Sequence, residues 1–249
     1  MVLECAKIAD RMQACERAGD AAGAKAADER LGFLTPILKG FLTEVGKEAA
    51  DLGMQVYGGH GYIKDNRAEQ VYRANPNPNP NPNPNPNPNP NPNPNPNPKP
   101  NPNPSQVYRD VRIAALWEGT TQIQALDLLG RKIMLQKLRP INEHCAELYR
   151  QCKPLLFSSD AQLRSHAWSL LAYAAEWQLL TYRIGLKARA DKEWISSSSV
   201  DYLMYSGYVS LASHWLQMES VAAAALASGE GAEEDAFYTA MVRSADPLP

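Results

Sequence analysis

A tract of fifteen dipeptides that each end in proline occupies residues 75–104 and divides the chain. All of them are Asn-Pro except Lys99-Pro100. Proline lacks a backbone donor and disfavours the α conformation in the residue before it, so no helix can form here. Because the tract has no apolar side chain to bury, we expect a solvated, disordered insertion over residues 74–105.

The same four residues, Gln-Val-Tyr-Arg, flank the tract at 70–73 and at 106–109. Deleting 36 residues leaves the uninterrupted sequence AEQVYRDVRIAALWEGTT. We therefore interpret the tract as an expansion or insertion that loops out of an older helix, since loop-closure entropy grows only slowly with length. A functional Asn-Pro arm is the alternative.

Composition excludes several classes of function. The 249 residues have a net charge of −2, which argues against nucleic acid or an anionic membrane as the main partner. The longest uncharged stretch outside the tract, 202–218, is too polar to span a membrane. The first residues, MVLECAKIAD, do not resemble a signal peptide, so we expect a cytoplasmic protein.

The cysteines are too few and too scattered for a disulfide framework or a zinc site. We expect free thiols and no metal; the four cysteines are Cys5, Cys15, Cys145 and Cys152.

The remaining sequence predicts an all-α fold. Thr35-Pro36 has the residues of an N-cap and first turn, and the apolar positions from Ile37 to Leu52 recur at three- and four-residue spacing. Gly58-Gly59 should end this helix. A second helix should start at Thr120 or Thr121; its expected apolar residues are Ile123, Leu126, Leu129 and Ile133.

Two further helices are expected in the C-terminal part of the chain. One should start at Ser158–Asp160, with an apolar face made of Leu163, Ala167, Leu170, Ala174 and Trp177. The other should follow Ser196–Ser199, with a face made of Tyr202, Tyr205, Val209, Ala212 and Leu216. No stretch alternates cleanly enough to predict a strand.

Two short motifs have residues suited to chemistry. QVYGGHGY (55–62) ends a helix in a glycine-rich turn, where bare backbone permits close approach of another molecule. An ordinary helix C-cap is the simpler interpretation of this motif, and a surface residue that of His60. The motif is not a dinucleotide fingerprint, because it lacks the third glycine and follows no strand.

The second motif is WEGTTQIQ (117–124). Trp117 should exclude water from Glu118 and raise its pKa, whereas the following helix N-terminus should favour the anion. A carboxylate balanced in this way can act as a general base, although helix-start glutamates are common. Gly119 leaves room for a substrate, and Thr120 with Gln122 offers donors to a phosphate or ribityl group.

Together, QVYGGHGYIKDNRAEQ and RDVRIAALWEGTTQIQALDLLGRK closely resemble the C-terminal helical domain of acyl-CoA dehydrogenases. We assign residues 1–137 to that domain. Residues 138–249 resemble, more loosely, the helical extension of a subgroup that includes the methylmercaptopropionyl-CoA dehydrogenases. The family's N-terminal and middle domains have no counterpart here, so we expect a C-terminal portion that is inactive alone.

The resemblance implies FAD-dependent oxidation of an acyl-CoA thioester to trans-2-enoyl-CoA. Glu118 would remove the α-proton while a hydride leaves for flavin N5, with Trp117 and Gly119 beside the substrate. Electron-transferring flavoprotein would be the acceptor. An acyl-CoA oxidase and a non-enzymatic helical module for oligomerisation or display are the alternatives.

The resemblance also implies how the cofactor is held. Thr120 and Gln122 would contact the FAD of the same subunit, while Gln55, Val56 and Gly59 would reach the FAD of a neighbour. Sharing the cofactor in this way implies a homo-oligomer. The segment with Arg109, Asp110 and Arg112 matches a family motif that we interpret as structural ion pairs.

Overall fold

The computed structural model describes residues 1–58, 110–228 and 235–244, in which helices dominate and no strand occurs. The all-α fold class is confirmed. Gly59, His60, Arg109 and the Asn-Pro tract lie outside the described residues. The elements are α1 (Val2–Arg17), α2 (Ala21–Val56), α5 (Thr121–Leu126), η2 (Asp127–Met134), α6 (Arg139–Cys152), η3 (Leu155–Phe157), α7 (Ala161–Ala190), α8 (Glu193–Ser228) and α9 (Asp235–Ser244).

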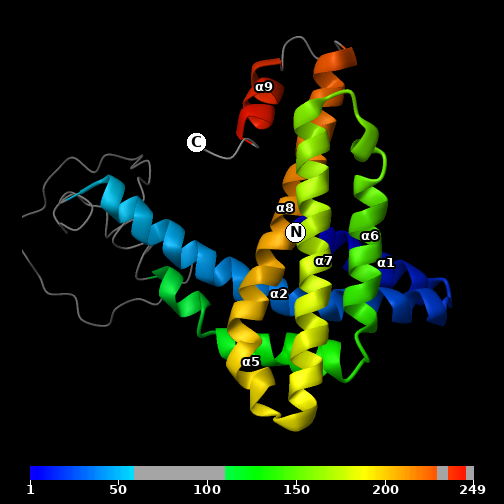
Figure 1. Ribbon diagram of the computed structural model, residues 1–249, viewed down its shortest axis with the longest axis vertical. Coiled ribbons are helices and arrows are strands. Elements are labelled where there is room, and N and C mark those ends of the chain that lie inside the picture. The colour runs from blue at the N-terminus through cyan, green and yellow to red at the C-terminus, as the bar shows by residue number, and fades with distance from the viewer. Residues whose placement is uncertain (59–109, 229–234, 245–249) are drawn as a thin grey trace, which may run out of the picture. The chain divides into compact units, whose positions relative to one another are not determined.

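The chain forms two compact units. The first unit comprises Met1–Leu42 and Gly119–Pro249, and the second comprises Thr43–Glu118. Helix α2 contributes residues to both. In the first unit, α6, α7 and α8 run side by side, and α7 contacts both of its neighbours (Figure 1).

Helix α7 confirms its sequence prediction in detail. Asp160 is the N-cap, and its carboxylate accepts hydrogen bonds from the backbone N–H groups of Gln162 (2.9 Å) and Leu163 (3.3 Å). All five predicted face residues are buried, with Trp177 fully so. One polar residue, Thr181, continues this face.

Helix α8 differs from the prediction in its start and its buried face. It begins at Glu193, so the Ser196–Ser199 run lies inside the helix. Tyr202, Val209 and Leu216 are buried as predicted, but Tyr205 is only half-buried and Ala212 is exposed. Half of the buried positions that the pattern missed are serines (Ser199, Ser206, Ser210 and Ser213), and the others are Leu203, Gly207, Glu219 and Ala222.

These serines are tolerated inside because their hydroxyls bond to their own helix. Ser206 Oγ donates to the Tyr202 carbonyl at 2.6 Å, and Ser210 Oγ donates to the Ser206 carbonyl at 2.7 Å. Small residues also let α8 approach α2 closely. A Cβ added at Gly207 would lie 2.1 Å from Cγ of the fully buried Phe41.

Helix α2 does not begin at the predicted Thr35-Pro36 cap. It runs through both residues, with Pro36 in its interior. Thr35 Oγ1 donates to the Leu31 carbonyl at 2.7 Å, and the buried Leu34 and Ile37 hold the helix on either side of the proline. Burial therefore outweighs the hydrogen bond that proline removes.

The predicted stop of α2 is confirmed as far as the described residues extend. The helix ends at Val56, and Gly58 has a left-handed backbone with φ of 57°. Its N–H donates to the Gln55 carbonyl at 2.9 Å. Gly58 thus supplies the conformation that other residues rarely adopt.

The predicted second helix starts at Thr120 as expected but then widens. Thr120 is the N-cap of α5, and η2 follows as a π-helix in which, for example, the N–H of Leu135 bonds to the carbonyl of Gly130. The wider turn buries Leu128 together with the predicted Leu129 and Ile133. The predicted Ile123 and Leu126 are exposed.

Candidate functional site

The backbone reverses sharply at Glu118 and Gly119, immediately before the N-cap of α5. Glu118 has φ of 57° and Gly119 has φ of 100°. A left-handed conformation is strained for glutamate, and strain of this kind is commonly kept at functional sites. The Gly119 carbonyl accepts a hydrogen bond from the ammonium group of Lys39, a contact that no sequence pattern indicated.

The expected shielding of Glu118 by Trp117 is wrong for the chain as described. Glu118 is exposed, and Trp117 is 66% exposed. Ile113 and Leu116 in the same unit are exposed to similar extents. Glu118 therefore lies next to exposed apolar side chains that nothing in its own unit covers. Water could be excluded from its carboxylate only if another protein surface covered this region.

The end of α2 also presents predicted cofactor residues to solvent. Val56 is 85% exposed, and its neighbours Leu52 and Tyr57 are exposed as well. Gln55 Nε2 donates to Asp51 Oδ2 at 3.0 Å within the same helix. Within this unit, α2 packs near the segment that leads to Glu118, since a Cβ at Gly46 would lie 3.7 Å from Val111.

Thr120 and Gln122 differ in what they can still offer a ligand. Thr120 Oγ1 accepts a hydrogen bond from the Ile123 N–H at 3.4 Å, which leaves its hydroxyl proton able to donate. Gln122 Nε2 donates to the Ser196 carbonyl (3.2 Å) and to Ser199 Oγ (3.1 Å) on α8. The expected donor role of Gln122 is therefore not available in this conformation, and its amide oxygen remains.

Comparison with known proteins adds to this geometry. A model described as "Acyl-CoA dehydrogenase, C-terminal domain" matches residues 3–76, and one described as "Acetyl-CoA dehydrogenase C-terminal like" matches residues 138–246. A 3-methylmercaptopropionyl-CoA dehydrogenase from Ruegeria pomeroyi is 31% identical over 216 residues. The chain is therefore similar to the acyl-CoA dehydrogenase family. Its similarity is to C-terminal domains, and the alignment covers 86% of this chain but 30% of that relative.

Few other features of the described residues could carry chemistry. All four cysteines are free. Burial raises the pKa of Cys145 to about 12 and that of Cys152 to about 11, which makes these two thiols unreactive. Among the described residues, no group of His, Cys, Asp and Glu is arranged to hold a metal ion, and no helix has the length and apolarity to cross a membrane.

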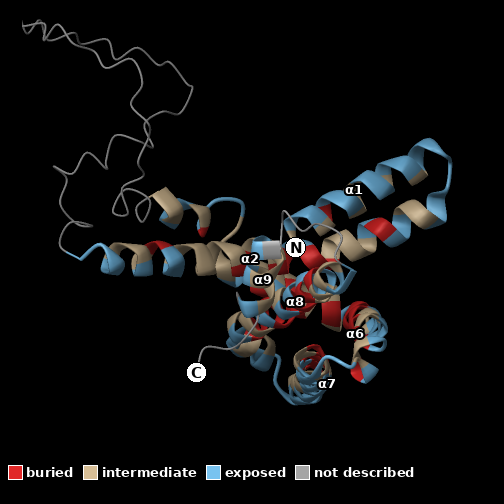
Figure 2. Cartoon of the chain, turned by 90° about the horizontal axis from the view of Figure 1, so that it is seen from above, coloured by how far each residue is buried: buried red, intermediate tan, exposed pale blue. Residues whose placement is uncertain are grey.

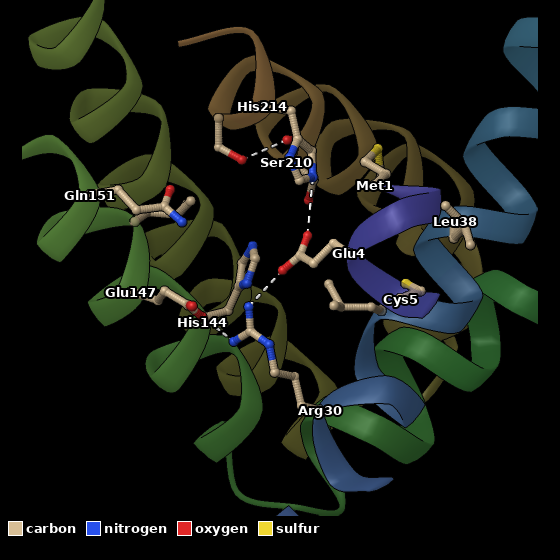
Figure 3. A pocket seen from close by; sticks show the side chains of 13 residues that line it. Met1, Glu4, Cys5, Arg30, Leu38, His144, Glu147, Gln151, Ser210 and His214 are labelled. Carbon is tan, nitrogen blue, oxygen red and sulfur yellow. Dashed lines mark hydrogen bonds and ion pairs between the residues drawn. The ribbon is translucent and has the colours of Figure 1, made fainter. Parts of the chain in front are cut away.

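A partly buried polar cluster in the first unit joins four helices (Figure 3). Glu4 on α1 lies between Arg30 on α2 and His214 on α8, at 2.8 and 3.1 Å, and Arg30 also pairs with Glu147 on α6. The bond from His214, together with Arg30, lowers the pKa of Glu4 to about 2. A cavity of about 10 Å³ beside these residues has room for one water molecule.

His144 borders the same cavity and is almost completely buried. Neither of its ring nitrogens has a hydrogen-bond partner among the described residues. The ring instead packs against two aromatic rings, tilted to Phe33 at a centroid distance of 5.4 Å and edge-on to Trp177 at 5.6 Å. Burial, and next the charge of Arg30, lower the pKa of His144 to about 4.

His144 should make the stability of the chain depend on pH. Its unfolded pKa is about 6.5, so stability is fully present above that pH and is lost as the pH falls towards about 4. The loss should reach about 3 kcal/mol below pH 4, with about 2 kcal/mol of it between pH 7 and pH 5, and His144→Leu should remove it. Urea unfolding at pH 7 and pH 5 measures this, in a range where Glu4 stays ionised. A pH dependence as large in the variant as in the wild type would contradict the assignment.

Proposed function

We propose that the chain provides the catalytic base and part of the cofactor site of an acyl-CoA dehydrogenase, which oxidises an acyl-CoA thioester to the trans-2-enoyl-CoA. The observation that carries this proposal is the strained turn at Glu118, which presents a carboxylate at the edge of an exposed apolar surface in a chain similar to this family. By analogy with the relative, small thioether acyl-CoA esters belong among the candidate substrates.

Glu118 would accept the proton from the carbon next to the thioester carbonyl. Covering Ile113, Leu116 and Trp117 with another protein surface would exclude water from the carboxylate and so suit it to act as a base. The backbone N–H of Glu118 would hold the thioester oxygen and stabilise its developing charge. When bound, FAD supplies the acceptor for the hydride that leaves the β-carbon.

The residues present fit part of an FAD site. The Thr120 hydroxyl can donate to the cofactor, whereas Gln122 can offer only its amide oxygen while it is bonded to α8. The exposed Val56 and the neighbouring Gln55 would meet the cofactor of a second subunit, which makes the active form a homo-oligomer. We further propose electron-transferring flavoprotein as the acceptor and the cytoplasm as the location.

Flavin binding tests this function. We expect the 249-residue chain alone to bind FAD weakly and to purify without colour, because the surface around Trp117 is uncovered. A chimera in which the chain replaces the matching region of the Ruegeria pomeroyi relative should bind FAD and lose its yellow colour on addition of acyl-CoA. Stoichiometric flavin in the isolated chain would contradict the need for a covering surface. A folded chimera without flavin would contradict the proposed cofactor.

A further inference from the structure

The outward face of α7 has a row of apolar residues that are exposed and do not belong to the core. Its members recur at alternating spacings of four and three residues, and all are exposed; we call this set the α7 seam (Trp168, Ala172, Ala175, Leu179, Tyr182 and Leu186). Tyr182 is 56% exposed and Leu179 is 53% exposed. At 1.5 Å per residue, the seam is about 27 Å long.

The α7 seam lies apart from the face of α7 that packs against the rest of the unit. The buried residues of α7 form a separate row that ends at Thr181, and Figure 2 shows the outward side of α7 as exposed. A repeat of seven residues with two apolar positions is the pattern by which one helix packs along another. A continuous apolar stripe of this kind is uncommon on the surface of a monomer.

We propose that the α7 seam binds the same seam of a second copy of the chain, with the two helices antiparallel about a two-fold axis between Leu179 and Tyr182. Charge supports this choice of occupant. Glu176 and Arg183 each directly follow a seam position, at the flank where helix pairs form salt bridges. In the antiparallel arrangement Glu176 faces Arg183 of the partner subunit, and the contact occurs twice.

A parallel pair would be less complementary. It would place Glu176 opposite the partner's Leu171 and Arg183 opposite the partner's Gln178, so neither charge would meet an opposite charge. The antiparallel register also matches side-chain size, since it sets Ala175 against the partner's Leu186. Leu186 and Tyr182 line a groove of about 560 Å³, into which side chains of the partner can enter.

Analytical ultracentrifugation of the full chain over a range of concentrations tests this proposal. We expect a reversible dimer, and Leu179→Glu should raise its dissociation constant at least tenfold by burying two charges in the seam. Tyr173→Glu is the matched control, because Tyr173 is 53% exposed on α7 but lies off the seam; this variant should dimerise normally. A monomer at all concentrations, or a dimer unaffected by Leu179→Glu, would overturn the proposal.

Charge reversal tests the antiparallel register and needs no change in the apolar residues. Glu176→Arg and Arg183→Glu should each weaken the dimer about tenfold, since each turns two attractive contacts into repulsive ones. The double variant should restore wild-type association. Glu176 also accepts a hydrogen bond from Tyr205 (2.8 Å), but Arg183 is about 10 Å further along the helix and cannot replace it within one chain. Failure of the double variant to restore the dimer would refute this register.

Discussion

Gly207→Leu is expected to destabilise the first unit by more than about 3 kcal/mol. The α-carbon of Gly207 lies so close to Phe41 that an added Cβ would be 2.6 Å from the Phe41 Cβ as well as 2.1 Å from its Cγ. Because Phe41 is fully buried and the clash includes its Cβ, rotation of the ring cannot relieve it. Helices α2 and α8 would have to separate at the centre of the unit.

Gly53→Leu is the matched control, since Gly53 is also helical but a Cβ there would meet nothing within 4 Å. This variant should gain about 0.5–1 kcal/mol from the better helix propensity of leucine. Thermal unfolding followed by circular dichroism compares the two. Equal melting temperatures for both variants would show that α2 and α8 do not pack as closely as described.

The sequence predicted most where local signals and burial agree. In α7, the Asp160 cap, the apolar spacing and the tertiary contacts all select the same face, so start and buried residues were both predictable. In α2 they disagree. The local signal at Thr35-Pro36 indicates a helix start, but the buried Leu34 and Ile37 carry the helix through the proline.

In α8 and η2 the buried residues differ from those predicted. The prediction counted only apolar side chains as core residues and assumed the period of an α-helix throughout. The apolar pattern does not include serine, yet Ser206 and Ser210 satisfy their hydroxyls within the helix and are buried. The apolar face after Thr120 was predicted with a period of 3.6 residues, which a π-helix does not follow. The spacing of residue types along the sequence indicates neither the buried serines nor the π-helix.

The sequence identified the residues of the candidate site, but it did not predict their exposure or their hydrogen-bond partners. The positions of Glu118 just before a helix start and of Thr120 at that start were expected from the sequence, whereas the left-handed backbone of Glu118 was not. The exposure of Trp117 was not expected, because an indole beside a carboxylate suggests shielding, whereas nothing in its own unit covers the ring. The partners of Gln122 on α8 are 74 and 77 residues away in sequence and left no local signal.

Glu118→Gln should lower the rate of flavin reduction in the flavin-loaded chimera by about 10²–10⁴-fold. The amide keeps the size of the side chain and the left-handed turn but cannot accept the α-proton. Acyl-CoA binding should change little, because the change leaves the apolar surface intact. Glu143→Gln is the matched control, since the Glu143 side chain is 65% exposed on α6 and belongs to the first unit.

Stopped-flow measurement of flavin bleaching by acyl-CoA, with Glu118→Gln and Glu143→Gln side by side, tests the role of Glu118 most directly. The expected result is rapid bleaching with Glu143→Gln and almost none with Glu118→Gln, although both bind FAD and acyl-CoA. Equal rates of bleaching in the two variants would show that another group removes the proton and would contradict the proposed function of Glu118.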